Sequence, residues 1–381
     1  MKRAILAFGL AGTSALVVPM IGAVQAGADY APQPGDVVAV SGDTAQFAGD
    51  FLSNGDYNGD AGFNSAGGVN RLVTFDATPD ANGRSAYTNS VTTGAASVAL
   101  NPTDVLRAGS YPVQRVSSSG NAISALLADT GSQETINFVF SSSLPTAAQD
   151  TQAANDGWGY LHVVEIGTDS VQIAADTTTN APTAGEGGLT AAELLTIYTS
   201  NSPITWSSAT GGADPSTADI LPLLPPSGSS IYKTFIAALT TANGGTAPSI
   251  GSIVKSVEQN DPTTITGSSS PANAIAPFSQ ARLNLWNDGY FHNPATAFPG
   301  GSTLTAGISL LSGYNSPLTD YVLFRQSDAA STTPFEPGGT ENWVQTLFSG
   351  TRPFVDTSGG QALIQAAGVT PVYDDLGSDG I

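Results

Sequence analysis

The stretch that decides the fold class runs from residue 37 to residue 52 and reads VVAVSGDTAQFAGDFL. It begins with four small or β-branched apolar residues, Val37 to Val40, which favour a short buried strand. The turn Ser41-Gly42-Asp43-Thr44 follows, and the amphipathic stretch from Ala45 to Leu52 then predicts a helix. Strand, polar turn and helix in this order form the repeating unit of α/β proteins.

The same unit recurs along the chain. Ser117-Ser118-Ser119-Gly120 precedes a predicted helix from Asn121 to Ala128. A buried strand from Ile136 to Phe140 ends in Ser141-Ser142-Ser143. A strand from Ile220 to Leu224 is followed by Ser227-Gly228-Ser229-Ser230 and a helix from Ile231 to Leu239. Further predicted elements are strands at Val69 to Phe75, Ala274 to Phe278 and Tyr321 to Phe324, and a late helix from Gln361 to Ala367.

Two more features of the middle of the chain support an α/β protein. Leu161 to Ile166 and Ser170 to Ala174 are predicted as a pair of strands separated by Gly167-Thr168-Asp169. Thr190 is predicted to cap a helix from Ala191 to Tyr198, with Glu193 completing a capping box.

The hydroxyl-rich turns suggest an anion site. A helix N-terminus carries unpaired backbone N–H groups and a partial positive charge, so it can hold an oxyanion without an Arg or Lys. Ordinary N-capping by Ser, Thr or Asp is the alternative for each turn taken singly. Several such turns converging on one cleft would form a site for a tetrahedral oxyanion.

Composition excludes several functions. The 381 residues include 31 acidic and 11 basic side chains, giving a formal net charge of −20, so nucleic acid and anionic membrane surfaces are unsuitable partners. No Cys is present, which excludes disulfides, thiolate catalysis, Cys-ligated zinc and a lipid anchor on an N-terminal Cys. With His162 and His292 alone, a multi-histidine metal centre is excluded, and no G-x-S-x-G motif occurs. We therefore expect no enzyme, no catalytic residues, no metal and no cofactor.

The N-terminus predicts export. Lys2 and Arg3 precede an apolar run from Ala4 to Val18, and Val24-Gln25-Ala26 offers small residues before a cleavage site. We expect residues 1–26 to be a signal peptide and the mature protein to be secreted, in the periplasm or the cell wall. Asp56-Tyr57-Asn58-Gly59-Asp60 has the spacing of acidic residues found in a Ca²⁺ loop, but a solvated turn is favoured because Ala61 and Gly67 stand where Gly and Glu are needed.

Seven stretches together resemble the phosphate-binding component of ABC phosphate importers, especially the larger actinobacterial forms. They occur in the family's order over roughly residues 35–330, and they are VSGDT from Val40, RVSSSG from Arg115, NFVFSSS from Asn137, LTAAELLTIYT from Leu189, LPPSGSSIYKTF from Leu224, EQNDP from Glu258 and NAIAPFSQAR from Asn273. The resemblance implies the α/β type II periplasmic-binding-protein fold, with two α/β lobes and a ligand cleft between them. We expect lobe 1 to comprise residues 29–146 plus 320–381 and lobe 2 residues 147–319.

The resemblance also implies a set of ligand-binding residues. Carried over motif by motif, they are Ser41, Asp43, Thr44, Ser118, Ser119, Ser141, Ser142, Ser227, Gly228, Ser229 and Ser230.

The chain departs from the family pattern at three places. The best-known members have an Arg just before the SGS/T loop, where Pro225 or Pro226 stands here. They have an Asp at the position of Ser142, which accepts a proton from phosphate and repels sulfate, so Asp43 is the remaining candidate for that role. Ile231 replaces the Thr that closes the loop.

Two arginines could replace the missing positive charge. Arg115 is included among the predicted ligand-binding residues, and Arg282 is a second candidate. The alternative for each is a surface ion pair in an acid-rich protein.

The predicted function is capture of inorganic phosphate or a similar oxyanion for delivery to an ABC permease, by a protein expected to be a monomer. A secreted surface or interaction protein that keeps the binding fold without a transport role is the alternative. A hydrolase is disfavoured because no nucleophile and base stand out as a pair.

Overall fold

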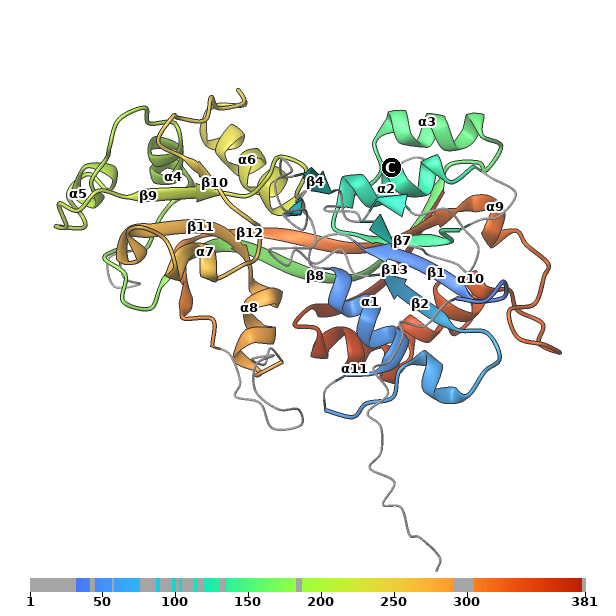
Figure 1. Cartoon of the computed structure of the whole chain (residues 1–381). Coiled ribbons are helices and arrows are strands. Elements are labelled where there is room, and N and C mark those ends of the chain that lie inside the picture. Colours follow the sequence, from blue (N-terminus) through green and yellow to red (C-terminus); the bar gives the residue numbers. More distant parts are fainter. Residues whose placement is uncertain are drawn as a thin grey trace, which may run out of the picture. The chain divides into compact units, whose positions relative to one another are not determined.

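A nine-stranded sheet organises the protein, shown in Figure 1 as a computed structural model. The structure describes residues 32–41, 45–56, 58–75, 87–89, 98–100, 103–104, 113–114, 119–130, 135–182, 187–290 and 305–378. The strands of the sheet are β1 (Val37–Ser41), β2 (Leu72–Phe75), β7 (Phe138–Ser141), β8 (Leu161–Asp176), β9 (Leu221–Leu224), β10 (Lys255–Ser256), β11 (Ala274–Ser279), β12 (Ile308–Arg325) and β13 (Thr370–Gly377). Two small antiparallel pairs lie apart from it: β3 (Tyr87–Asn89) with β4 (Val98–Leu100), and β5 (Thr103–Asp104) with β6 (Val113–Gln114).

Helices accompany the strands. The α-helices are α1 (Ala45–Asn54), α2 (Ser119–Ala128), α3 (Ala147–Asn155), α4 (Ala191–Tyr198), α5 (Trp206–Ala209), α6 (Ser230–Ala242), α7 (Thr263–Thr266), α8 (Gln280–Asn287), α9 (Gln326–Ala329), α10 (Trp343–Leu347) and α11 (Ser358–Ala366). Short 3-10 helices are η1 (Phe63–Ala66), η3 (Pro271–Asn273) and η4 (Phe354–Asp356). None of the described helices is long and apolar enough to span a membrane.

The strand order is β10-β9-β11-β8-β12-β7-β1-β2, and β13 also pairs with β8. In one half, β1 is parallel to β2 and β7, and β12 runs antiparallel to β7. In the other, β9 is parallel to β10 and β11, and β8 runs antiparallel to β11. Three parallel strands closed by one antiparallel strand thus occur twice, which confirms the α/β class and the type II architecture. The expected lobe boundaries stay a prediction.

Two long strands belong to both halves. β8 has 16 residues and β12 has 18, and they pair antiparallel from Leu161 opposite Arg325 to Asp176 opposite Ile308. Figure 1 shows them side by side, β8 in green and β12 in orange. Because of this pairing all the strands of the sheet form one connected ladder.

The expected pair of strands separated by Gly167-Thr168-Asp169 is wrong, because these residues lie inside β8 and pair with Asp320, Thr319 and Leu318. Gly167 does not form a turn; its lack of a side chain allows residues 369 and 370 to pack closely against β8. A Cβ there would lie 2.4 Å from Val369 Cγ1 and 3.0 Å from the backbone oxygen of Thr370, at the start of β13.

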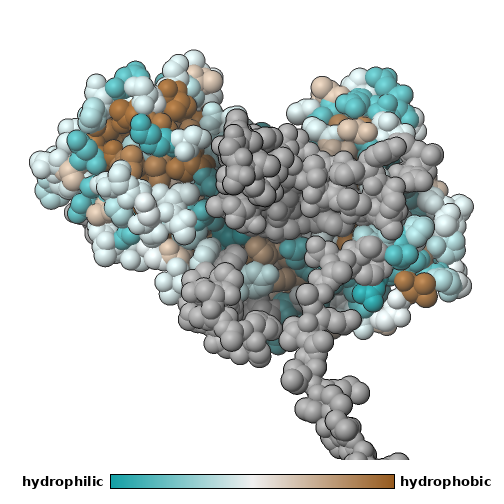
Figure 2. All heavy atoms as spheres, in the orientation of Figure 1, coloured by the Kyte–Doolittle hydropathy of each residue, from teal (hydrophilic) through white to brown (hydrophobic). Residues whose placement is uncertain are grey.

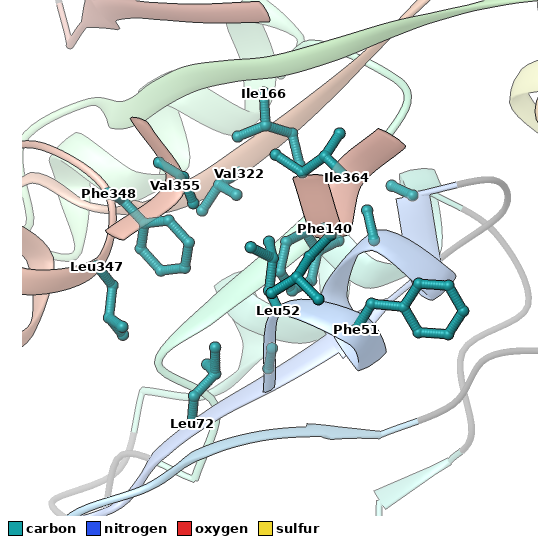
Figure 3. Close-up of a cluster of buried hydrophobic side chains, with 14 of the residues drawn as sticks. Phe51, Leu52, Leu72, Phe140, Ile166, Val322, Leu347, Phe348, Val355 and Ile364 are labelled. Atoms are coloured by element: carbon teal, nitrogen blue, oxygen red, sulfur yellow. The ribbon is translucent and has the colours of Figure 1, made fainter. Parts of the chain in front are cut away.

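Separate hydrophobic cores fill the two halves. Around α1, β7 and α11, the side chains of Leu52, Phe140 and Ile364 pack together with Val322 of β12, as Figure 3 shows. A second core gathers Trp206, Phe235 and other side chains around α4 and α6. On the face drawn in Figure 2, brown atoms gather where α4 and α6 lie. β8 and β12 contribute to both cores.

Several predicted helix ends are confirmed and others move. Thr190 caps α4, and its Oγ1 accepts the Glu193 N–H at 3.3 Å while the Glu193 carboxylate accepts the Thr190 N–H at 2.8 Å, so the capping box is confirmed. α6 is longer than predicted at both ends, and α11 begins at Ser358 rather than at Gln361.

Candidate functional site

The hydroxyl-rich turns follow the carboxyl ends of parallel strands, the edge at which open α/β sheets bind ligands. Ser41 ends β1 and pairs with Phe140 of β7, and Ser141 is the next residue of β7. Ser229 and Ser230 follow β9 in the other half. Four predicted site residues lie outside the described residues: Asp43, Thr44, Arg115 and Ser118. Their neighbour Gly42 also lies outside them.

The serine triplet and the start of α2 are in direct contact. The backbone N–H of Ser142 donates to Ser119 Oγ at 2.9 Å, and both residues are buried. Ser141 is engaged within the turn, where its Oγ donates to the Ser143 carbonyl at 2.8 Å and accepts the Ser143 N–H at 3.0 Å. Two of the predicted turns therefore meet, 23 residues apart in the chain.

A carboxylate that sequence reasoning missed lies beneath this contact. Ser142 Oγ donates to Asp320 Oδ1 at 2.5 Å, and Asp320 is fully buried on β12. A buried carboxylate needs hydrogen-bond donors because burial strongly disfavours an uncompensated charge. Asp320 therefore joins Asp43 as a candidate carboxylate of the site, because it contacts the predicted site residue Ser142.

The start of α6 combines capping with buried hydroxyls. Ser229 Oγ accepts the Tyr232 N–H at 3.0 Å, so the N-capping alternative holds for this residue. An oxygen that accepts at a cap still has its own hydrogen to donate. Ser229 and Ser230 are buried, whereas Ser227 is exposed and Gly228 is half-buried.

Lys233 brings the starts of α6 and α2 together. Its Nζ lies 3.1 Å from the position that a Cβ would occupy at Gly120, the second residue of α2. Among the described residues, the Lys233 ammonium has no ion-pair partner. Lys233 was not among the predicted site residues, although the sequence places a cation four residues after Ser229, one turn into the helix.

A second buried polar cluster follows β11 and β10. Asp169 accepts the Ser279 hydroxyl at Oδ2, and its Oδ1 accepts the Ala281 N–H at 2.8 Å. Burial raises the pKa of Asp169 above its ordinary value, against the hydrogen bonds and the nearby Arg282, which lower it. Asn260 Oδ1 accepts the Ser279 N–H at 3.0 Å, and this residue has a left-handed backbone with φ of 52°.

Arg282 is not a surface residue. It is 5% exposed, and its guanidinium carbon lies 4.2 Å from the ring centroid of Phe47 in the first turn of α1. The surface position considered for Arg282 is therefore wrong. Arg282 extends from α8 to the helix that follows the first predicted ligand loop.

The acidic loop at 56–60 forms a turn. Asp56 Oδ1 accepts the backbone N–H groups of Asn58 at 3.0 Å and Asp60 at 2.8 Å. Within the part of the chain that the structure describes, no group of three or more His, Asp or Glu side chains is placed to hold a metal ion.

Comparison with known proteins adds similar structures but no family assignment. No family model and no curated protein matches the chain. A structure from Clostridium perfringens, named as a phosphate ABC transporter substrate-binding protein with bound phosphate, is 13% identical to this chain, with a TM-score of 0.49. The match covers 88% of this chain and 100% of that one. An ABC-type phosphate transport receptor from Vibrio cholerae is 11% identical, with a TM-score of 0.45 and the same coverage of both chains. The fold assignment rests on the strand order given above.

The chemistry available at this edge of the sheet is anion binding. Backbone N–H groups at two helix starts, buried serine hydroxyls and one ammonium group are all hydrogen-bond donors, and Asp320 is an acceptor.

Proposed function

We propose that the protein is an exported solute-binding protein that captures a small tetrahedral oxyanion, in the first place phosphate, for ABC-type import. The observation that carries the proposal is that the start of α2 contacts the turn after β7, while the Lys233 ammonium of α6 reaches the start of α2. The seven stretches that resemble phosphate-binding components, and the strand order of the sheet, support the same conclusion.

Selectivity for a protonated oxyanion would come from the buried carboxylate. Asp320 accepts from Ser142, and a carboxylate beside a bound anion favours a ligand that brings a proton of its own. Phosphate carries such a proton at neutral pH and sulfate does not. In this proposal Asp320, alone or with Asp43, takes the role of the family's Asp.

The surrounding organisation is part of the proposal. Residues 1–26 would direct export, the two halves would form lobes with the ligand cleft between them, and a membrane permease would receive the ligand. The alternative is a secreted surface or interaction protein that keeps the binding fold without a transport role, and deleting its gene would leave phosphate uptake by the cells unchanged.

Calorimetric titration of the mature protein with phosphate, sulfate and other oxyanions tests the binding function. We expect phosphate to bind in preference to sulfate. If none of the oxyanions produces a binding heat, the proposed function is rejected.

The first prediction concerns Ser229→Ala. The substitution removes a hydroxyl donor at the start of α6, and a hydrogen bond to a charged group contributes about 1.5–3 kcal/mol, so phosphate affinity should fall about 10- to 150-fold. Thr190→Ala is the matched control, because it also removes an N-cap but at α4. Equal affinities of the two variants for phosphate would contradict a ligand role for Ser229.

A further inference from the structure

Lys233 occupies a position that is electrostatically unfavourable in the absence of an anion. It lies in the first turn of α6, where a helix has its positive end, and its ammonium reaches the first turn of α2, which is the positive end of a second helix. Neither first turn contains an acidic residue that would compensate.

Two buried arginines of the described structure have partners of their own. Arg325 is fully buried, where it donates to the Ile136 carbonyl at 2.8 Å and to the Asp129 carbonyl at 3.0 Å. Arg282 packs against Phe47 and lies near Asp169. Lys233 is exposed and has no ion-pair partner among the described residues, so its charge remains accessible to a ligand.

From these observations we propose that Lys233 supplies a positive charge to the oxyanion site and links the two halves through the bound anion. The inference rests on the proposed function and identifies the residue that determines its charge dependence. An anion between the two helix starts would accept from α2, from α6 and from the ammonium together. Without the anion, the ammonium lies beside the positive end of α2 with no opposite charge, so we expect the ligand to stabilise the approach of Lys233 to α2.

The position also explains how an acidic protein attracts an anion. With a net charge of −20, the long-range field of the protein repels phosphate. A single ammonium within hydrogen-bonding distance of the anion attracts it at short range, whereas the repulsion comes from charges that are farther away. Two helix starts add partial charges of the same sign.

The test compares Lys233→Met, Lys233→Arg and the control Lys255→Met, which removes an exposed ammonium from β10. We expect Lys233→Met to weaken phosphate binding about 10- to 150-fold, as loss of a hydrogen bond to a charged group does. Lys233→Arg should restore most of the affinity, and the control should match the wild type. The dependence of affinity on NaCl concentration should be shallower in Lys233→Met than in the wild type.

Thermal unfolding of the ligand-free proteins gives a second readout that a merely structural role would not produce. Removing an uncompensated cation from two helix starts should leave the melting temperature of Lys233→Met equal to or above that of the wild type. Loss of stability with unchanged phosphate affinity would overturn the proposal for Lys233 while the proposed function stands. Absence of oxyanion binding by the wild type would instead overturn both.

Discussion

Asp169 is the described ionisable residue whose environment has the clearest consequence for pH. It lies in the middle of β8, and its two oxygens accept from Ser279, Ala281 and Ser170. Burial raises its pKa above the ordinary 3.8, because the charged form loses its contact with water. The carboxyl group of Asp169 is therefore harder to ionise in the folded protein than in the unfolded chain.

The sign of its effect on stability follows. A raised pKa in the folded state contributes stability that is complete below the ordinary pKa and is lost as pH rises through the folded value. Asp169→Asn lacks this ionisation, so the free energy of unfolding of the wild type relative to the variant should decrease as pH rises above 3.8. Urea denaturation at a series of pH values measures the difference, with the exposed Asp60→Asn as control. A relative stability of the wild type that increases over that interval would contradict this assignment.

The candidate site residues predicted from the sequence differ in kind from the candidates that the structure adds. Ser119 and Ser142 belong to hydroxyl-rich turns beside predicted elements, so local sequence indicates them. Asp320 matters because it meets Ser142, which is 178 residues away in the chain, and Lys233 matters because it reaches Gly120. Contacts between distant segments leave no pattern in the local sequence.

At the scale of elements, the close approach of β13 to β8 depends on Gly167. A side chain there would meet the side chain of Val369, which is buried and cannot move aside, and the backbone of Thr370. Gly167→Val should lower the free energy of unfolding by roughly 1–3 kcal/mol, the usual effect of overpacking a core. Gly359→Ala is the control, because a Cβ at this position in α11 meets nothing closer than 3.9 Å. The two variants unfolding at the same urea concentration would show that Gly167 is not required.

Elements with a strong local signal were predicted well, and those shaped by their neighbours were not. The strand and helix around the turn at 41–44 and the capped helix α4 were found, because apolar pattern and capping residues agree there. β8 was divided in two because Gly-Thr-Asp is a turn composition, whereas its pairing with β12 keeps the strand extended. α8 was not predicted. One of the residues on its buried side is the charged Arg282, which interrupts the apolar pattern in the sequence of this helix.

At the scale of the whole molecule, the acidic excess acts on folding as well as on binding. A net charge of −20 produces repulsion that is strongest when the chain is compact. Adding NaCl, from about 0.05 M to about 0.5 M, shortens the screening length to a few ångströms and should raise the melting temperature. Differential scanning calorimetry measures the effect, and a melting temperature that falls with NaCl would show that attractive ion pairs dominate instead.

β8 and β12 pass between the halves as a continuous two-stranded ribbon, so a change in the angle between the halves is spread as twist over many backbone dihedral angles. Their ladder is irregular at two places, between Leu311 and Asn315 and between Asp320 and Tyr321. An irregular ladder increases local twist, so the ribbon deforms most readily there. The second irregularity lies at Asp320, the carboxylate that accepts from Ser142, so we expect any twisting of the ribbon to reorient this carboxylate and an anion bound beside Ser142 to resist the twist.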